Sequence, residues 1–580
     1  MSVAPDLAML PDENRLGQPL ETVAETFLSL LKSRGIENFF VNAGTDFAPL
    51  VEGYARLGDA AKTQFPRPII AAHEGVVMGM AHGAYLVTGK PQGVMFHVNV
   101  GTANAACGVL NAARENVPIL VCAGRSPIFE DGKLGARNTR VAWGQEMFDQ
   151  GGLMREAVKW EYELRGGLHV EDVVDRALII AMSEPRGPVY LTLPREVLAE
   201  QSLLAHSVRP NVSVPTNSYP APVEIGRLAD ALVGAEMPVI SSLASGADPA
   251  SVALLARICD QFAIGYVEDQ GRYLNLPTDH SLHLGFKLSP VLDAADAWLF
   301  VESDVPWVSH WGAPRRDAFI AHAGSDPAFA SYPMRSHRCD LSIKSGATPL
   351  FEALIEALQA RSSHIDPGRR ERIALRAMQL RELTERKRLE LSSGPAGITQ
   401  ASLSVVLDKL LPDNSILFNE YWVVREMLKR TKPASYFYLP ATGGLGWALP
   451  AAIGAKLAMP NRTMVAAIGD GTYMFSNPVA CHHASQKHSL PVLTVIANNS
   501  RWDAVDLTAR FAYPDGHMAK QTRQELSDLR PSPAYEKLVA ASDGLGIVVS
   551  DPAELEDALR AGFQAVQNEG RSAVINVLVQ

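Results

Sequence analysis

The sequence MVAAIGDGTYMFSNPVACHHASQKHSLPVLTVIANN, residues 464–499, decides the fold. Its first apolar run predicts a buried strand that ends at Asp470, and Gly471 then opens a helix. A second apolar run, LPVLTVIANN, predicts the next strand, which ends at Asn498 and Asn499. Because open α/β sheets bind ligands at the carboxyl ends of their strands, one βαβ unit brings these polar residues to a single binding edge.

These residues predict a site for a diphosphate group and Mg²⁺. Backbone N–H groups at the helix start, from Gly469 to Thr472, would bind the anion. Asp470 would supply an oxygen ligand, which a hard cation needs beside phosphates. A glycine-flanked aspartate after a strand is more often a tight turn, so this motif alone is weak evidence. Its pairing with Asn498 and Asn499 makes the prediction specific.

A GDG motif followed, after a helix and a strand, by NN resembles the thiamine diphosphate enzymes. In that family the aspartate, the second asparagine and the main-chain oxygen two residues later bind magnesium. The resemblance therefore implies Asp470, Asn499 and the carbonyl of Arg501 as metal ligands. The order of the segments along the chain resembles the acetolactate synthase-like group, which is related to oxalyl-CoA decarboxylases and 2-hydroxyacyl-CoA lyases.

A second motif is RPIIAAHEGVVMGMAHGAYLVTGK, residues 67–90, where an apolar strand meets a helix rich in small residues. Taken alone, Glu74 would more often be a solvated acid in a first helical turn. Its apolar neighbours, such as Val76 and Val77, argue for burial instead. The segment resembles the activating glutamate segment of the family, which implies that Glu74 is catalytic and binds a ring nitrogen of the cofactor's aminopyrimidine.

Further segments are expected to complete the cofactor site. In ATGGLGWALPAAIGAKL, residues 441–457, Gly444 lets the backbone approach a ligand closely. The resemblance implies that Leu445 separates the two cofactor rings, and the alternative is a leucine in the core. Asn104, in a segment similar to the family's glycine-rich loop and helix, is expected beside the pyrimidine. The upstream pair Tyr421 and Trp422 is also assigned to the cofactor site.

The substrate pocket is less specific in sequence. Its candidate residues are Asp46, His73, His97, Asn99, Arg125 and Trp502. Acetolactate synthases commonly carry a glutamine after the glycine at this point, whereas here Gly124 is followed by Arg125. A permanent cation can bind a carboxylate or phosphate in bidentate fashion. The alternative is a surface or ion-paired arginine.

Composition indicates a globular protein with several domains. The chain has 580 residues, of which 47% are hydrophobic and 20% charged, and its net charge is −10. Basic runs with interleaved aromatic residues are absent, so nucleic acid is not an expected partner, and the acidic balance does not favour a membrane surface. Five scattered cysteines without a Cys-x-x-Cys motif, and a first segment unlike a signal peptide, predict a cytoplasmic protein.

Alternating apolar strands and helical periods predict three α/β domains, each with a doubly wound parallel sheet. They are an N-terminal pyrimidine-binding domain (20–200), a central domain (215–360) and a C-terminal domain that binds diphosphate and Mg²⁺ (395–580). Residues 206–224 are rich in proline and small polar residues and predict a linker, and a charged helix is expected at about 369–391. The first and last domains could be divergent copies of one fold.

The central region departs from flavin-containing synthases. PVISSLASGADPAS (238–251) stands where they tend to have a glycine-triple turn, and ESDVPWVSHWG (302–312) replaces their Arg-Phe-Asp-Asp run. FAD is therefore not expected. The alternative is ADP or coenzyme A, with Arg315 and Arg316 as a phosphate contact, although adjacent arginines are usually just solvated.

The resemblance implies an enzyme that makes or breaks the carbon–carbon bond next to a carbonyl. The favoured reaction is decarboxylation of a 2-oxo acid with carboligation. One alternative is a lyase that releases formyl-CoA from a 2-hydroxyacyl-CoA, and a second is a non-catalytic structural homologue. In the family one cofactor bridges two subunits, so a homodimer or homotetramer is expected. Residues 501–522 are expected to form a lid over the site.

Overall fold

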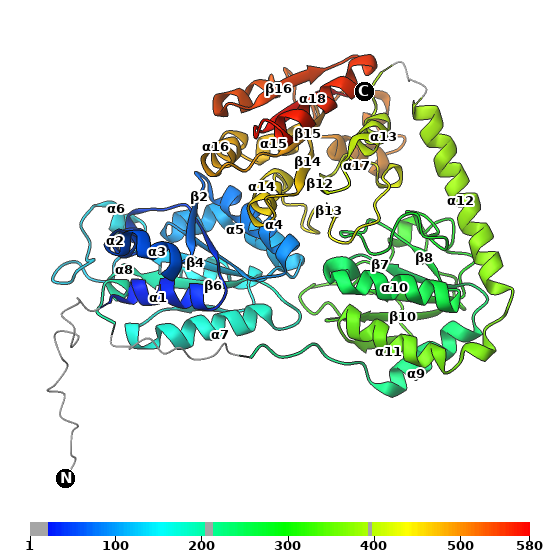
Figure 1. The fold of residues 1–580 in the computed structure, drawn as a ribbon, viewed down its shortest axis with the longest axis horizontal. Coiled ribbons are helices and arrows are strands. Elements are labelled where there is room, and N and C mark those ends of the chain that lie inside the picture. The colour runs from blue at the N-terminus through cyan, green and yellow to red at the C-terminus, as the bar shows by residue number, and fades with distance from the viewer. Residues whose placement is uncertain (1–20, 203–212, 393–396) are drawn as a thin grey trace, which may run out of the picture. The chain divides into compact units, whose positions relative to one another are not determined.

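The computed structural model describes residues 21–202, 213–392 and 397–580. These residues form two compact units, each built on parallel β-sheets (Figure 1). The first unit comprises the described residues within 1–81, 89–182 and 186–215, and the second comprises those within 82–88, 183–185 and 216–580. The first unit contains one sheet and the second contains two.

The first unit is built on a six-stranded parallel sheet with the order β2-β1-β3-β4-β6-β5. Its strands are β1 (Asn38–Val41), β2 (Arg67–Ile70), β3 (Gln92–Phe96), β4 (Ile119–Arg125), β5 (Glu161–Glu163) and β6 (Val189–Pro194). The associated helices are α1 (Val23–Ser33), α2 (Ala48–Leu57), α3 (Ala61–Gln64), α4 (Glu74–Thr88), α5 (Val98–Arg114), α6 (Val141–Gly144), α7 (Val170–Met182) and α8 (Arg195–Leu198). Alternate strand residues face opposite sides, so Phe39 and Leu120 pack in one buried cluster with residues of α1 and α7.

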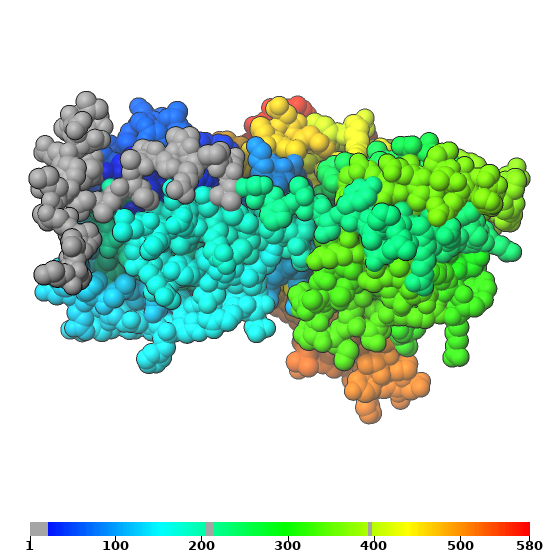
Figure 2. Space-filling model, turned by 90° about the horizontal axis from the view of Figure 1, so that it is seen from below, coloured from blue at the N-terminus to red at the C-terminus, as the bar shows by residue number. Residues whose placement is uncertain are grey.

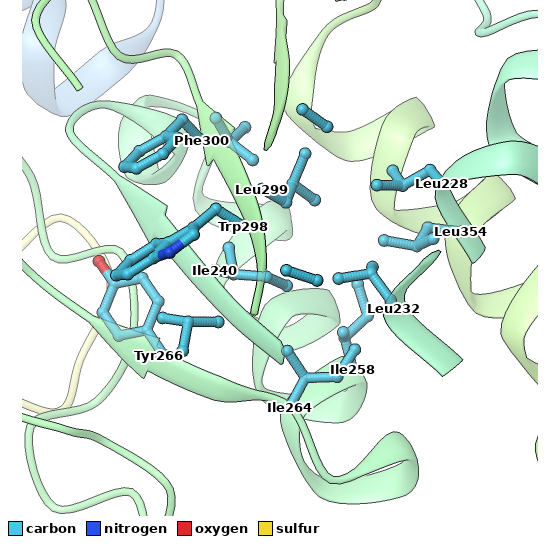
Figure 3. Close-up of a cluster of buried hydrophobic side chains, with 14 of the residues drawn as sticks. Leu228, Leu232, Ile240, Ile258, Ile264, Tyr266, Trp298, Leu299, Phe300 and Leu354 are labelled. Carbon is cyan, nitrogen blue, oxygen red and sulfur yellow. The ribbon is translucent and has the colours of Figure 1, made fainter. Parts of the chain in front are cut away.

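The central sheet has five parallel strands in the order β11-β10-β9-β7-β8. Its strands are β7 (Pro238–Ser242), β8 (Gly265–Val267), β9 (Ala297–Val301), β10 (Phe319–Gly324) and β11 (Leu341–Lys344), and its helices are α9 (Pro222–Gly234), α10 (Pro249–Phe262), α11 (Ala347–Gln359) and α12 (Arg369–Ser392). Trp298 and Phe300 of β9 project to one face and stack at 5.3 Å, whereas Leu299 projects to the other (Figure 3). Both faces of the sheet are therefore covered by apolar side chains.

The third sheet again has six parallel strands, in the order β13-β12-β14-β15-β17-β16. Its strands are β12 (Ser415–Glu420), β13 (Tyr436–Tyr438), β14 (Thr463–Gly469), β15 (Leu493–Asn498), β16 (Leu545–Val549) and β17 (Ala573–Leu578). The helices are α13 (Gln400–Leu410), α14 (Ala448–Ala458), α15 (Asp470–Phe475), α16 (Pro478–His488), α17 (Asp503–Ala512) and α18 (Leu555–Gln567). Alternate residues Val465 and Ala467 of β14 pack in one cluster with Leu407 of α13 and Phe563 of α18.

The prediction of three parallel-sheet α/β domains is confirmed by these sheets. Their limits at 20–200, 215–360 and 395–580 stay predictions. The charged helix expected at about 369–391 is α12, which lies on the face seen in Figure 2 (yellow-green). None of the helices in the described ranges is long and apolar enough to cross a membrane.

Two local predictions need correction. The single helix expected after Asp470 is two helices, because α15 ends at Phe475 and Asn477 takes a left-handed conformation before Pro478 starts α16. The linker expected to reach residue 224 ends earlier, since α9 begins at Pro222, with a proline in its first turn. The part of that linker at 206–212 falls outside the described residues.

Candidate active site

Asp470 lies at the carboxyl end of β14 with a carboxylate oxygen that has no partner among the described residues. Its side chain is 3% exposed, and Oδ2 is buried without a hydrogen bond to any described residue. Burial raises the pKa of Asp470 to about 6. Hydrogen bonds from the backbone N–H groups of Gly471 and Ser500 lower this pKa, but they are the smaller effect. A buried carboxylate oxygen without a partner is costly in an apoprotein and fits a bound cation.

The two asparagines at the end of the neighbouring strand differ in their environment. β14 and β15 pair in parallel with Gly469 opposite Ala497, so the residues that follow lie at one edge. Asn498 is buried and bonded to Ser532 and Asn576. Asn499 is partly exposed, and its Oδ1 accepts from the N–H of Arg501 at 3.2 Å. Asn499 is thus the asparagine that remains accessible beside Asp470.

Arg501 and Trp502 follow the asparagines. The Arg501 backbone forms a bridge with Asp528, and its guanidinium pairs with Asp503 at 3.0 Å, so its side chain is engaged locally. The ring of Trp502 lies against Gly471 and meets Phe475 edge to face, with ring centroids 5.7 Å apart. Trp502 therefore covers the start of α15 just before α17 begins at Asp503.

The carboxylate of Glu420, which was not among the predicted site residues, holds the start of α14. Glu420 ends β12 and is fully buried. One carboxylate oxygen accepts from the N–H of Gly446 at 2.8 Å and of Trp447 at 3.2 Å, and the other accepts from Ala448 at 2.7 Å. Burial raises the pKa of Glu420 to about 7, although these three N–H groups oppose the rise.

The predicted cofactor residues Tyr421, Trp422, Gly444 and Leu445 flank this carboxylate. Tyr421 is 47% exposed and has a φ of 81°, a left-handed conformation rare for a tyrosine. Trp422 is buried in the core, and its Nε1 donates to the carbonyl of Val495 at 3.3 Å, so its main chain is the part left for a ligand. Gly444 and Leu445 are partly exposed in the turn before α14.

In the first unit, Glu74 is the first residue of α4 and is 7% exposed. Nδ2 of Asn104 on α5 donates to Glu74 Oε2 at 3.2 Å. The structure thus brings together two residues that were predicted from separate segments. His73, also a candidate, bonds within its own loop, where its Nδ1 accepts from the N–H of Gly75 at 3.0 Å.

Asp46, buried in the turn that follows β1, pairs with the partly exposed His97 at the end of the adjacent strand β3. Asp46 Oδ1 lies 2.6 Å from His97 Nδ1, and Oδ2 accepts from the N–H of Val98 at 3.2 Å. The hydrogen bond to Asp46 raises the pKa of His97 above its usual value. The amide of Gln145 lies 3.0 Å from His97 Nε2. This network can hold a proton on the imidazole and orient the ring.

The backbone is shaped around this pair. A Cβ on Gly124 would lie 1.7 Å from Asp46 Oδ2, so only glycine fits at the end of β4. Val98 has a φ of 30°, an outlier for a β-branched residue, and it places its N–H on Asp46. Strain of this kind is stored where surrounding contacts over-determine the conformation, as at functional sites.

Arg125 lies next to this network but is largely engaged. It pairs with Glu163 at 3.1 Å and donates to the carbonyl of Met147 at 2.7 Å. This is the ion-paired alternative, although Nη1 is buried without a hydrogen bond to any residue in the described ranges. Asn99, in the first turn of α5, likewise has a buried Oδ1 without a described partner.

At the carboxyl edge of the central sheet, polar groups bind one another. Asp304 pairs with Arg272 and accepts from the Tyr332 hydroxyl at 2.7 Å, and Arg335 donates to its carbonyl at 2.6 Å. Arg315, one of the two predicted phosphate contacts with Arg316, pairs with Asp317 at an exposed position. Each of these groups therefore has a partner among the described residues.

Sequence reasoning missed Glu420 and Gln145. Glu420 had a usable signal, because it ends the apolar run SILFNE as Asp470 ends MVAAIGD. Gln145 had none, since only the fold brings the segment around α6 to His97.

Comparisons with known proteins agree with this arrangement. Residues 21–153 match the family described as thiamine pyrophosphate enzyme, N-terminal TPP binding domain. Residues 419–577 match the family described as thiamine pyrophosphate enzyme, C-terminal TPP binding domain. The first matched region contains β1 to β4 of the first sheet, and the second contains β13 to β16 and most of β17 of the third sheet.

Similar proteins include decarboxylases and synthases. A benzoylformate decarboxylase of Pseudomonas aeruginosa is 27% identical, covering 84% of this chain and 87% of its own length. A probable acetolactate synthase of Mycobacterium bovis is 24% identical, covering 94% of each. The solved 4-hydroxybenzoylformate decarboxylase of Rhodococcus jostii RHA1 superposes with a TM-score of 0.74 at 22% identity, covering 96% of this chain and 99% of that one, which shows a shared fold.

Proposed function

Because this chain belongs to the thiamine pyrophosphate enzymes, we propose that it binds thiamine diphosphate with Mg²⁺ and decarboxylates a 2-oxo acid. The single observation that carries the proposal is the buried Asp470 carboxylate, whose Oδ2 has no partner among the described residues. In a family whose cofactor carries a diphosphate, a cation at this oxygen offsets the cost of burying the charge.

Asp470, the accessible Asn499 and the carbonyl of Arg501 would hold the cation. Gly469, Gly471 and Thr472 would lie against the diphosphate. Tyr421, Gly444 and Leu445 would contact the rings, and Trp422 would contribute its main chain. All of these residues lie at or just beyond the carboxyl ends of β12, β14 and β15, or in the turn before α14.

When bound, thiamine diphosphate supplies a nucleophilic carbon and accepts the electron pair of the bond that breaks. Glu74 would exchange a proton with a ring nitrogen of the aminopyrimidine, with Asn104 holding its Oε2 in place. The 7% exposure of Glu74 keeps water from competing for that proton. This role needs a carboxylate, and a neutral amide at the same place would not perform it.

His97, supported by Asp46, would donate the proton that the substrate receives. With Nδ1 bonded to Asp46, the imidazole presents Nε2 toward Gln145 and retains its proton at a higher pH than a free histidine. A protonated His97 would protonate the product carbon after carbon dioxide leaves, and an aldehyde would be released. If a second carbonyl compound reached that carbon before the proton, carboligation would follow instead.

The relatives support decarboxylation as the first step. Their printed names include benzoylformate decarboxylase and acetolactate synthase. The coenzyme A lyase alternative is favoured by the non-flavin central region and by Arg125, with Arg315 and Arg316 as a phosphate contact. Arg125 and Arg315 both have carboxylate partners within the chain. A non-catalytic homologue would be expected to lose Glu74 or a metal ligand, and this chain has Glu74, Asp470 and Asn499 together.

We further propose that the protein acts as a homodimer, alone or within a tetramer. Glu74 of one subunit and Asp470 of the partner subunit would then serve one cofactor, as the family resemblance implies. Light scattering during size-exclusion chromatography, with activity measured on each fraction, tests this proposal. An active monomer would contradict it.

Turnover by the purified protein with thiamine diphosphate and Mg²⁺ tests the reaction. We expect carbon dioxide from at least one member of a panel of pyruvate and longer or aromatic 2-oxo acids. Omission of the cofactor, chelation of Mg²⁺ and the Glu74→Gln variant are the matched controls. Formyl-CoA from a 2-hydroxyacyl-CoA, without carbon dioxide from any 2-oxo acid, would replace decarboxylation by the lyase reaction.

A further inference from the structure

Glu420 is a buried carboxylate for which the proposed reaction has no chemical use. It is fully buried at the end of β12, and none of the ion pairs among the described residues includes it. Its partners are the backbone N–H groups of Gly446, Trp447 and Ala448. A buried acid bonded only to backbone is rare, because burial of a carboxylate needs strong compensation.

These three N–H groups begin α14, so Glu420 caps a helix from a different strand. Helix starts are usually capped by a short local side chain at the N-cap position. Here the N-cap residue is Trp447, which makes no side-chain cap bond. A local serine or aspartate would satisfy the helix at lower cost, so the long-range carboxylate points to a need to fix where the helix starts relative to β12.

The turn at the start of α14 also packs against α15. Gly446 has a φ of 85°, and a Cβ at this position would lie 2.5 Å from the carbonyl carbon of Phe475. Phe475 ends α15, the helix that begins with Asp470. Glu420 therefore fixes a turn that packs directly on the helix carrying the proposed cation ligand.

The same carboxylate stands beside the strained Tyr421. The chain leaves β12 through the left-handed Tyr421, whose hydroxyl lies 3.2 Å from where a Cβ of Gly443 would be. Residues 443–446 are thus held on one side by Tyr421 and at their end by Glu420. Gly444 and Leu445, between these two contacts, are the residues proposed to meet the cofactor rings.

We propose that Glu420 is a positioning residue that fixes the 443–446 turn against α15. It would thereby keep Gly444 and Leu445, which are proposed to contact the rings of thiamine diphosphate, at a constant distance from the proposed cation ligand Asp470. This inference rests on the proposed use of that cofactor. It assigns Glu420 an effect on cofactor affinity through backbone placement, without contact to substrate or a role in proton transfer.

The test compares Glu420→Gln with wild type by calorimetric titration of thiamine diphosphate in the presence of Mg²⁺. Glutamine has the same shape but replaces one acceptor oxygen by a donor, so at least one N–H loses its partner. We expect the cofactor Kd to rise about tenfold or more, which is the effect of losing one charge-assisted hydrogen bond. At saturating cofactor, kcat should stay within about threefold of wild type and the substrate KM should not change.

Glu302→Gln is the matched control. Glu302 is a carboxylate at the carboxyl end of β9, its pKa is also raised to about 7 by burial, and it accepts from the N–H of Ser325 at 2.8 Å. A similar loss of thermal stability without a change in cofactor Kd is expected there. If Glu420→Gln lowered Tm as the control does but bound the cofactor as tightly as wild type, the positioning role would be wrong.

Glu420→Asp covers the case in which the glutamine variant does not fold. The shorter acid retains the charge but reaches fewer of the three N–H groups, so an intermediate Kd is expected. An aspartate variant with wild-type Kd would also contradict the inference. A wild-type protein that binds no thiamine diphosphate would instead overturn the proposed function, and the two failures are distinguishable in the same titration.

Discussion

The first and third sheets have the same strand order when the strands of each are numbered along the chain, yet their carboxyl ends carry different chemistry. Both follow the pattern 2-1-3-4-6-5. The first presents the Asp46–His97 pair and Glu74, which are groups that exchange protons. The third presents Asp470, whose buried Oδ2 has no partner among the described residues, and the accessible Asn499. Under the proposed function, one topology would serve proton transfer at one edge and the binding of an anion and a metal ion at the other.

The equivalent helices show how the difference arises. α4 follows the edge strand β2, and α14 follows the edge strand β13. α4 begins with its own acid, Glu74, whose Oε2 accepts a hydrogen bond from Asn104. α14 begins with an apolar sequence, and its first N–H groups donate hydrogen bonds to Glu420 from the neighbouring strand. The start of the equivalent helix therefore carries an acid of its own in the first sheet and is capped by an acid from a neighbouring strand in the third.

The largest expected effect follows from replacing the reactive acid of the first sheet. Glu74→Gln should lower kcat by about 10²- to 10⁴-fold, the range for loss of a general acid–base group. The fold should be unchanged, because glutamine can keep the contact with Asn104. Carbon dioxide release under saturating cofactor measures the effect, and circular dichroism checks the fold. Activity near the wild-type level would show that Glu74 is not the activating residue.

The corresponding change in the third sheet should act on binding. Asp470→Asn should weaken Mg²⁺-dependent cofactor binding by at least the roughly 10- to 100-fold that loss of a partner costs a metal site. Titration of thiamine diphosphate at several Mg²⁺ concentrations measures this loss. His97→Asn is the cross-control and should keep the cofactor Kd. If both variants lost affinity for the cofactor equally, the assignment of cation-dependent cofactor binding to the third sheet and of proton transfer to the first would be wrong.

A smaller effect concerns the pH dependence of the first sheet. Asp46 raises the pKa of His97 above its usual 6.5, so His97 keeps its proton to a higher pH than an isolated histidine. The Asp46→Asn variant should move the corresponding limb of the kcat/KM profile to lower pH. In the wild type, the stability due to this pair should be complete below pH 6.5 and decline as the pH rises through the folded-state pKa of His97. An unchanged limb would place the titration on another group.

The smallest effect is expected in the central sheet, where the polar side chains described at the carboxyl edge already bind one another. Arg315→Ala should leave the free energy of unfolding essentially unchanged, because its ion pair with Asp317 is exposed. Activity should be the same as that of wild type. If wild type bound ADP or coenzyme A and the variant did not, the nucleotide alternative for this domain would be supported instead.

Strand-forming runs and the GDG and NN motifs were enough to predict the parallel sheets and the edge that carries Asp470. Local signals also existed for one feature that was missed: Asn477-Pro478 marks the break between α15 and α16. Other features depend on distant partners. Asp46 and His97 were separate candidates, and only the adjacency of β1 and β3 pairs them. The engagement of Arg125 by Glu163 likewise comes from tertiary structure.

The proposal that both edges serve one cofactor, across two subunits, is tested most directly by complementation. Glu74→Gln and Asp470→Asn chains carrying different affinity tags would be co-expressed, and the mixed dimer isolated by both tags. Within that mixed dimer one site carries both substitutions and the other carries none, so we expect about half of wild-type activity from two nearly inactive parents. A mixed dimer as inactive as its parents would contradict the account, because it would place Glu74 and Asp470 of the same chain in one site.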